Sequence, residues 1–355
     1  MTRAGGGLLL AANPSPEHVG GHLYKAAISM GIDTVVHDVR LATAGPRWAA
    51  AAFWRLGRRP LRMGQYGKSL LACCAQFEPR VCISVGIAPI ARHVLLAIRE
   101  MGIPAFNFLS DDPWNPSRYA PWFLEALPHY DCVFSPRRAN LEDLKRHGCR
   151  TVSYLPFAYS EEMHLIPDVR ASAEDPSGPD IVFVGGADAD RIPFMSALLE
   201  ANFTLRLYGG YWDRFPATRS CACGIVPPQQ ARRATAGARI ALCLVRRANR
   251  DGHVMRSFEI PAMGSCMLAE STAEHRDLFG EEGQAVLYFN GIPELIRKAR
   301  WLLEHPEERR RLRTALYRRI TSGGHTYGDR LRSMLAYSPR AVGPEREPAR
   351  IGTER

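Results

Sequence analysis

Short apolar segments alternate with helical patterns along this chain, and the series occurs twice. The first set of apolar runs lies at 8–12, 34–39, 81–86, 105–110, 131–136 and 151–158. A second set follows at 180–186, 204–210, 238–244, 267–270 and 285–289. Such alternation is typical of parallel sheets with helices on both faces. The sequence therefore predicts an α/β chain made of two Rossmann-like, doubly wound domains.

A polar, proline-containing segment separates the two series. Residues 167–180 read PDVRASAEDPSGPD, which is the composition of a linker. We expect an N-terminal domain over 1–166, a linker over 167–180 and a C-terminal domain over 181–337, whose last helix can pack back on the N-terminal domain. Residues 338–355 carry too few apolar side chains to fold, so we expect a disordered tail. Two such domains face each other across a cleft, where open sheets bind ligands beyond the carboxyl ends of their strands.

Neither a membrane span nor a disulfide framework is visible in the sequence. No apolar run approaches the roughly 20 residues that cross a bilayer. The apolar run LLLAA is soon followed by Pro14 and Pro16, which favours a first buried strand over a signal segment. The 9 cysteines are an odd number without evident pairing, and Cys221 and Cys223 are too close together for the usual metal pair. We expect reduced thiols and a cytoplasmic protein.

The chain is basic, with 46 Lys and Arg against 36 Asp and Glu. The excess is concentrated at 55–62 and 307–319. Basic faces favour phosphates, anionic membrane surfaces or nucleic acid. Because no nucleic-acid motif with interleaved aromatic residues accompanies them, we expect no nucleic acid as partner. A phosphate-bearing ligand and a peripheral contact with an anionic membrane surface remain as expectations.

Glycine pairs end two neighbouring strands of the predicted C-terminal domain. Gly185 and Gly186 follow one strand, and Gly209 and Gly210 follow the next. Without side chains, such turns let backbone N–H groups approach a phosphate at the start of a helix. A plain turn from strand to helix explains either pair equally well. Two pairs together favour a tight crevice rim, with the aromatic side chains beside the second pair available to stack on a base.

The stretch NRDGHVMRSFEIPAMG, residues 249–264, mixes charged and apolar side chains unusually. We interpret it as the start of a helix that faces a ligand, with its apolar side buried. Arg256 can pair with a diphosphate, aided by the positive end of the helix, and Glu259 can accept hydrogen bonds from a ribose diol. Asp251 and His253 precede them. The alternative is a capped helix, with Asp251 near its N-cap and Arg256 and Glu259 as a surface pair.

Polar residues also follow a strand end in the N-terminal half. Asp111 and Asp112 come directly after the strand at 105–110, and Trp114 and Asn115 follow. The carboxylates can act in acid–base chemistry on an acceptor hydroxyl, or can merely cap the loop. Trp114 can offer a flat apolar platform to a sugar, whereas buried packing is favoured for Trp122.

The junction between the first strand and its helix is a further cleft position. His18, Gly20, Gly21 and His22 lie there and can orient an acceptor or contact donor phosphate, although a lone histidine is more often simply solvated or hydrogen-bonded. The sequence Asp188-Ala-Asp190 matches a metal-binding D-x-D motif, but its position just before a predicted helix favours a role in capping that helix. No other cluster has metal-ligand spacing, so we expect neither a metal nor a cofactor.

Several segments resemble one known family. The run MRSFEIPAMGSCMLAESTAEHRDLFGEEGQAVLYFNGIPELIRKARWLLEHPEERRRL and its continuation GHTYGDRLRSML are similar to the C-terminal domain of the CgeB-like, or spore-maturation-protein-like, GT-B glycosyltransferases. FLSDDPWNPSRYAPWFLEALPHYDCVFSPRRANLEDLKRHG and LPFAY resemble the same group, so the likeness runs from about residue 80 to 336. The FE-x-x-A-x-G core is similar to the second half of the E-x7-E motif of retaining GT-B enzymes. That motif places the ribose-binding acid at Glu259 and its first acid at Asp251, an Asp instead of a Glu.

The resemblance implies a GT-B, hexosyltransferase-type enzyme that moves a sugar from a nucleotide-diphosphate sugar to an acceptor hydroxyl, with retention of configuration. Donor-binding residues would be Gly185, Gly186, Gly209, Gly210, Asp251, His253, Arg256 and Glu259. Acceptor-binding residues would be His18, Gly20, Gly21, Trp114 and Asn115. Asp111, Asp112 and Arg256 would be catalytic; in a retaining enzyme the donor phosphate can serve as base, which leaves the aspartates to position the acceptor.

Two other classes of function stay open. The aspartate at position 251 is compatible with a nucleotide-sugar sensor that binds without catalysis. An epimerase of the same architecture would interconvert nucleotide sugars without an acceptor. Glycans, small molecules and proteins are all open as acceptors.

Overall fold

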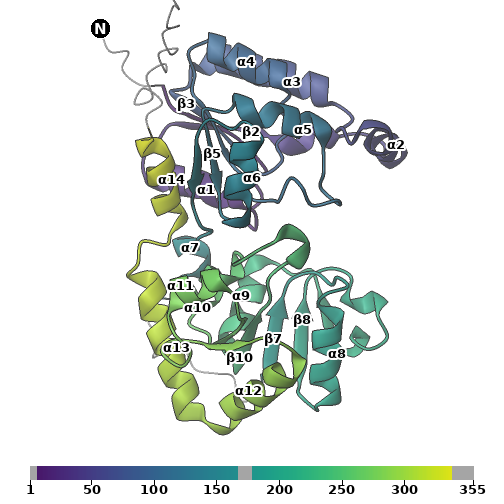
Figure 1. The fold of residues 1–355 in the computed structure, drawn as a ribbon, viewed down its shortest axis with the longest axis vertical. Helices are drawn as coiled ribbons and strands as arrows, with labels where there is room; N and C mark the ends of the chain where they lie inside the picture. The colour runs from purple at the N-terminus through teal and green to yellow at the C-terminus, as the bar shows by residue number, and fades with distance from the viewer. Residues whose placement is uncertain (1–5, 167–177, 338–355) are drawn as a thin grey trace, which may run out of the picture.

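A computed structural model describes residues 6–166 and 178–337 and has two α/β domains, one above the other in Figure 1. Each domain contains a six-stranded sheet in which all neighbouring strands are parallel. The order is β2-β1-β3-β4-β5-β6 in the first sheet and β12-β11-β10-β7-β8-β9 in the second. In both sheets the first strand of the domain, β1 or β7, is an interior strand, and later strands are added on both sides of it. This order confirms the predicted doubly wound class.

The N-terminal domain contains the first six strands and most of the first seven helices. Its strands are β1 (Leu8–Ala12), β2 (Thr34–Asp38), β3 (Val81–Val85), β4 (Ala105–Phe108), β5 (Cys132–Ser135) and β6 (Val152–Tyr154). Its helices are α1 (Val19–Ser29), α2 (Arg47–Gly57), α3 (Met63–Phe77), α4 (Arg92–Glu100), α5 (Pro121–Ala126) and α6 (Ala139–Arg146), with 3-10 turns η1 (Val39–Thr43) and η2 (Leu127–His129). The short helix α7 (Glu161–His164) follows at the exit from this domain.

The C-terminal domain repeats the plan. Its strands are β7 (Ile181–Val184), β8 (Leu205–Tyr208), β9 (Ala222–Gly224), β10 (Ile240–Cys243), β11 (Met267–Glu270) and β12 (Leu287–Phe289). Its helices are α8 (Ile192–Glu200), α9 (Pro228–Gly237), α10 (Arg256–Ala262), α11 (Ala273–Phe279), α12 (Ile292–Glu304) and α13 (Pro306–Thr321), with turns η3 (Trp212–Arg214), η4 (Arg219–Cys221) and η5 (Arg247–Asn249). The last helix, α14 (Tyr327–Ala336), leaves this domain.

The two faces of each sheet belong to separate hydrophobic clusters. In β1, Leu8 and Leu10 contribute to one cluster with α1 and α14, whereas Leu9 contributes to another with α3, α4 and α5. Successive side chains of a strand point to opposite faces, so a strand covered on both sides is apolar throughout. This explains why LLLAA reads as a continuous apolar run, and all five of its residues are buried.

The chain returns to the N-terminal domain through α14, which lies beside α1 (Figure 1). Thr326 and Asp329 form a capping box at the start of α14. Arg330 then donates hydrogen bonds to the carbonyl oxygens of Pro156 (2.7 Å) and Phe157 (3.0 Å). These contacts join the last helix to the first domain. The linker expected at 167–180 falls largely on 167–177, and the tail on 338–355, outside the described residues.

Candidate active site

Two adjoining cavities lie between the carboxyl ends of the two sheets. The larger one has a volume of about 600 Å³ and is lined by both domains. The smaller one, of about 190 Å³, lies mainly against the C-terminal domain. Glu17, Val184, Gly185 and Arg256 line both cavities, so the two spaces meet at these residues. The site therefore consists of two chambers, the larger and the smaller cavity, which are connected at a junction formed by these four residues.

Arg256 and Glu259 occupy the junction and the smaller chamber. They lie one helical turn apart at the start of α10 and form an ion pair, as their spacing predicts. The pair is only partly accessible, because the Glu259 side chain is 1% exposed and the Arg256 side chain 35%. Arg256 also donates from Nε to the carbonyl oxygen of Val184, at 3.1 Å. Burial lowers the pKa of Arg256 to about 10, so its guanidinium stays charged at neutral pH.

The walls of the smaller chamber are mostly apolar beyond Glu259. Tyr208 at the end of β8, Ile225, Val226 and Pro228 line it. The smaller chamber thus combines an aromatic ring and aliphatic side chains with a buried carboxylate. Such a combination suits a ligand with one planar, weakly polar part and one diol.

One glycine of each pair, Gly185 and Gly209, lies at the edge of this chamber. Gly209 has φ +125°, and a Cβ atom there would lie 2.4 Å from the carbonyl oxygen of Gly185. The two strand ends thus approach each other as only glycine permits. Gly185 lines both chambers and Gly209 lines the smaller one, whereas Gly186 and Gly210 stand outside the lining. Tyr208 is the aromatic neighbour that faces the chamber.

The larger chamber has a basic lining, with more arginines than acidic residues. Its lining includes five arginines and three groups from the first strand-to-helix junction: Arg118, Arg137, Arg191, Arg246 and Arg256, with Asn13, His18 and Gly20. Arg191 is buried, and burial lowers its pKa. Arg137, Arg191 and Arg246 were not among the site residues predicted from the sequence. Their position directly after strands or at helix starts is the signal that could have identified them.

Of the two adjacent aspartates, Asp111 lines the larger chamber. Its Oδ2 accepts a hydrogen bond from the Ser110 hydroxyl at 3.3 Å. Asp112 is 1% exposed and binds Arg250 of the C-terminal domain through both oxygens, at 2.6 and 3.1 Å. Asp112 is thereby engaged between the domains, and Asp111 is the carboxylate that can reach a ligand.

Trp114 and Asn115 also serve the contact between domains. Asn115 donates from Nδ2 to Oδ1 of Asn249 at 2.6 Å. The guanidinium of Arg250 lies 5.8 Å from the ring of Trp114. Neither Trp114 nor Asn115 lines a chamber. Trp122 is buried and donates to the carbonyl oxygen of Arg58, as the packing interpretation predicts.

Asp251 and His253 face the N-terminal domain as well. Asp251 forms a buried ion pair with Arg137, which follows β5. His253 accepts a hydrogen bond at Nε2 from the backbone N–H of Phe157 (3.1 Å), so Nδ1 carries the proton that it donates to Glu274 (2.7 Å). Asp251 lines the larger chamber, and His253 lines neither.

Residues 249–253 therefore form an interdomain clamp, which is followed by the ligand-facing residues 256 and 259. The clamp consists of Asn249, Arg250, Asp251 and His253, and each of the four binds a residue of the N-terminal domain. This division explains the mixture of charges in one short segment. The first half holds the domains together, and the second half presents a guanidinium and a carboxylate to the cavities.

Asp251→Asn tests the clamp. Burial raises the pKa of Asp251, an increase that Arg137 partly offsets, and the ion pair is buried on both sides. We expect the variant to lose about 1–3 kcal/mol of unfolding free energy in urea titrations, because Arg137 loses its charged partner. The control is Asp277→Asn, which removes an exposed interdomain pair with Arg138 and should cost less than about 1 kcal/mol. If both variants lose the same free energy of unfolding, the buried pair of Asp251 and Arg137 does not hold the domains together more strongly than an exposed pair does.

The remaining acceptor candidates lie at the start of α1. His18 and Gly20 line the larger chamber, and His22 lines the smaller one. Gly21 lines neither; a Cβ atom there would lie 2.2 Å from the carbonyl oxygen of Ser15. Gly21 thus allows α1 to pack closely on the preceding loop.

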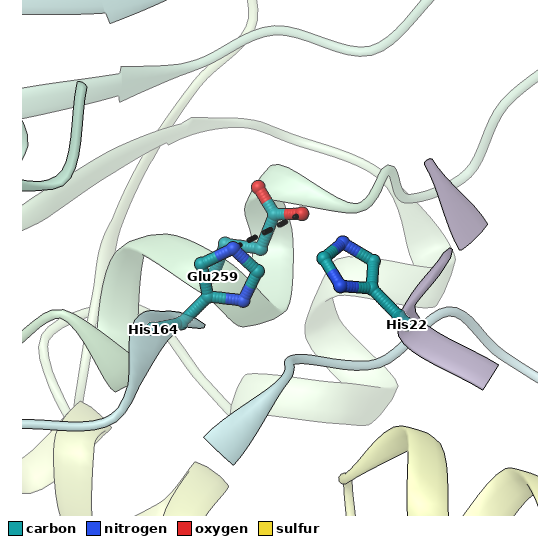
Figure 2. Close-up of side chains that lie close together, drawn as sticks. All are labelled: His22, His164 and Glu259. Atoms are coloured by element: carbon teal, nitrogen blue, oxygen red, sulfur yellow. Dashed lines mark ion pairs between the residues drawn. The ribbon is translucent and has the colours of Figure 1, made fainter. Parts of the chain in front are cut away.

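His22, His164 and Glu259 form a cluster in the lining of the smaller chamber. Figure 2 shows both imidazole rings beside the Glu259 carboxylate. Their potential ligand atoms lie within 4.8 Å of one another, which makes this the candidate metal cluster among the described residues. Sequence reasoning placed His22 near the cleft but did not identify His164, because residue 164 lies far from both partners along the chain.

The hydrogen bonds of His164 favour a neutral ring with its proton on Nε2 over a ring that binds a metal. Nδ1 of His164 accepts from the backbone N–H of Ser160 at 3.0 Å, which leaves the proton of the neutral ring on Nε2. Nε2 is the nitrogen that faces Glu259, at 3.9 Å. A protonated nitrogen cannot ligate a cation, whereas metal-binding histidines usually donate their second N–H elsewhere. The Asp188 carboxylate of the D-x-D sequence accepts hydrogen bonds from the backbone N–H groups of Asp190 and Arg191, so it closes the turn that leads into α8.

The pH dependence of folding tests the buried state of this cluster. Burial, with a contribution from Arg256, lowers the pKa of His22 to about 3. Below about pH 6.5 the unfolded chain takes up a proton that folded His22 does not, so stability falls by about 1.4 kcal/mol per pH unit for this group. His22→Gln should reduce the slope of unfolding free energy between about pH 6 and 4.5 by this amount. An unchanged slope, or the same change in the exposed control His93→Gln, would exclude a buried neutral His22.

The sequence is similar to one protein family and to one spore protein. Residues 191–336 match the family described as Glycosyl transferase-like. This match covers most of the C-terminal domain and the last helix, α14. The chain is also 19% identical to the spore protein CgeB of Bacillus subtilis over 294 residues, which cover 77% of this chain and 87% of CgeB. Both findings support a CgeB-like GT-B glycosyltransferase, the resemblance expected from the FEIPAMG segment.

Solved structures share the fold over almost the whole chain. Sucrose-phosphate synthase from Thermosynechococcus elongatus superposes with a TM-score of 0.65 at 12% identity, over 92% of this chain and 96% of that protein. Anabaena HepE in complex with UDP-glucose gives 0.61 at 11% identity, over 93% and 98%. The putative UDP-N-acetylglucosamine 2-epimerase of Listeria monocytogenes gives 0.53 at 13% identity, over 93% and 94%. These likenesses confirm the GT-B type of two-domain fold.

Proposed function

We propose that the protein transfers a sugar from a nucleoside-diphosphate sugar to an acceptor hydroxyl. The observation that carries the proposal is the junction at Arg256, where an apolar chamber containing Glu259 meets a larger basic chamber. The base and ribose would occupy the smaller chamber, with the ribose diol on Glu259 and the base against Tyr208. The diphosphate would lie at the junction, and the sugar would enter the larger chamber. The UDP-glucose complex of the structural neighbour HepE is consistent with this class of donor.

Arg256 would carry the main electrostatic task. As the sugar leaves the diphosphate, negative charge grows on the bridging oxygen, and a fixed guanidinium nearby stabilises it. Arg191 is buried and lines the larger chamber, so its guanidinium would add to the positive potential beside the diphosphate. Gly185 and Gly209 would bring backbone groups close to the phosphates.

On the opposite wall, Asp111 would position the acceptor hydroxyl. It is the strand-end carboxylate that lines the larger chamber, because Asp112 is engaged by Arg250. His18 and Gly20 line the same wall and would contact the acceptor. We propose retention of configuration, supported by the resemblance of the FE-x-x-A-x-G segment; the donor phosphate would then accept the proton of the hydroxyl. Glycan, small-molecule and protein acceptors, and a cytoplasmic location, stay predictions.

Binding of nucleotides to the full chain tests the proposal. In a thermal-shift panel of UDP, GDP, dTDP and ADP, at least one nucleotide should raise the melting temperature, because a ligand of the folded state stabilises it. The matching sugar donor should then lose sugar slowly to water. Binding without any hydrolysis or transfer would favour a sensor, and conversion of the sugar without acceptor would favour an epimerase. Absence of a shift with all four nucleotides would contradict the donor assignment.

Turnover is expected without a divalent cation. Arginine side chains line the junction, and the hydrogen bonds of His164 disfavour a metal in the histidine cluster. Donor hydrolysis measured after exhaustive treatment with a chelator should therefore keep at least half of its rate, with the untreated protein as reference. A loss of activity that only Mg²⁺ or Mn²⁺ restores would contradict this and would direct attention to Glu259 and the two histidines as ligands.

A further inference from the structure

Helix α2 has its apolar face directed to solvent. Trp48, Ala52 and Leu56 repeat every fourth residue, and Phe53 lies beside them, so these side chains share one face. Trp48 is 77%, Phe53 48% and Leu56 89% exposed. A surface helix of a folded domain normally turns such a stripe toward the core. In Figure 1, α2 instead projects from the edge of the N-terminal domain, away from both sheets.

The opposite side of α2 attaches the helix to the domain in this orientation. The guanidinium of Arg58 lies 5.5 Å from the ring of Trp54 and donates to the carbonyl oxygen of Pro116 at 3.5 Å. The carbonyl oxygen of Arg58 accepts from Nε1 of Trp122 at 2.6 Å. These contacts fix the C-terminal end of α2, so the stripe of Trp48, Phe53 and Leu56 faces outward.

The segment around α2 carries positive charge alone. Between Asp38 and Glu78 the chain contains no acidic residue, while it has seven basic ones: Arg40, Arg47, Arg55, Arg58, Arg59, Arg62 and Lys68. Arg55, Arg59 and Arg62 are exposed. A contact between two copies of this face would bring these like charges together, which disfavours a symmetric dimer. The charge is instead complementary to a negatively charged surface.

We propose that α2 docks the protein on an anionic lipid membrane. Helices that lie in the membrane interface combine Trp, Phe and Leu on one face with Arg or Lys at its border, as α2 does. The apolar side chains would enter the boundary between headgroups and acyl chains, and the arginines would contact anionic headgroups. None of the helices over residues 6–166 and 178–337 has the length and apolar character to cross a membrane, so the contact would be peripheral. This inference does not depend on the proposed transfer reaction.

Vesicle sedimentation of the full chain tests the docking surface. With vesicles of phosphatidylcholine that contain about 30% phosphatidylglycerol, we expect binding that weakens steeply with salt and is at least tenfold weaker for pure phosphatidylcholine. The double variant Trp48→Ala/Leu56→Ala should bind at least tenfold more weakly. The double variant Arg55→Gln/Arg59→Gln should lose the preference for anionic vesicles. Trp301→Ala, which removes a partly exposed tryptophan of the other domain, is the control and should bind as the unmodified protein does.

The melting temperature of each variant shows whether it folds, and the exposed positions should leave it unchanged. Three results would overturn the proposal: no binding to anionic vesicles at low salt, binding that Trp48→Ala/Leu56→Ala does not weaken, or self-association of the full chain that this double variant abolishes. The last result would show that a second copy covers the face.

Discussion

Replacing Arg256 with alanine is expected to slow sugar transfer by about a hundred- to a thousandfold. The side chain lines both chambers, and its guanidinium is held at their junction by Glu259 and by the carbonyl oxygen of Val184. Without it the departing diphosphate loses its nearest fixed positive charge. Because the charge develops during the reaction, the loss should lie mainly in kcat, which initial rates with both substrates varied would show.

Two further variants separate catalysis from folding. Arg256→Lys keeps the charge but not the planar fork, so transfer should recover partly, while the buried Glu259 keeps a cationic partner. Arg247→Ala is the matched control, since Arg247 lies nine residues before Arg256 in the chain, lines neither chamber and pairs with Glu270. A normal transfer rate in Arg256→Ala would contradict a role of Arg256 in catalysis. An equally large fall in the transfer rate of Arg247→Ala would contradict it as well.

Glu259→Gln is expected to weaken binding of the nucleoside diphosphate by about ten- to more than a hundredfold. The substitution keeps the size of the side chain but replaces charge-assisted hydrogen bonds to the ribose diol, a loss of roughly 1.5–3 kcal/mol. Calorimetric titration with the best nucleotide of the panel measures it. Affinity for the acceptor should stay nearly unchanged, because the proposed acceptor wall belongs to the other domain.

The control for Glu259→Gln is Glu142→Gln. Glu142 is exposed on α6 and pairs with Lys145, so this variant should bind nucleotide normally. If Glu259→Gln lowers the melting temperature but leaves nucleotide affinity intact, the carboxylate is a buried structural partner of Arg256, and the ribose site lies elsewhere in the cleft.

Much of the fold could be predicted from the sequence, because strands covered on both faces read as short apolar runs. Each predicted strand segment contains a strand, although the run at 151–158 forms a strand only over Val152–Tyr154. The three-residue edge strand β9 gives too short a pattern to detect. Helix α2 buries none of its described residues, so its apolar face does not mark a core.

The candidate site could be predicted only where its residues lie close together along the chain. Arg256 and Glu259 are one turn apart, and helical spacing alone predicts their shared face. The partners of the clamp are not readable in this way, because Arg137 and Asp251 are 114 residues apart and Asp112 and Arg250 are 138 apart. Charged residues at strand ends read equally as catalytic or as interdomain partners. Only the packing of the two domains distinguishes Asp111 from Asp112.

A crystal structure of the full chain with the nucleoside diphosphate that binds best would locate the donor site. We predict the base beside Tyr208 and Ile225, the ribose hydroxyls on the carboxylate of Glu259, and the diphosphate against Arg256, where the two chambers meet. A nucleotide bound on the N-terminal wall, or outside both chambers with Glu259 and Arg256 still paired to each other, would contradict it.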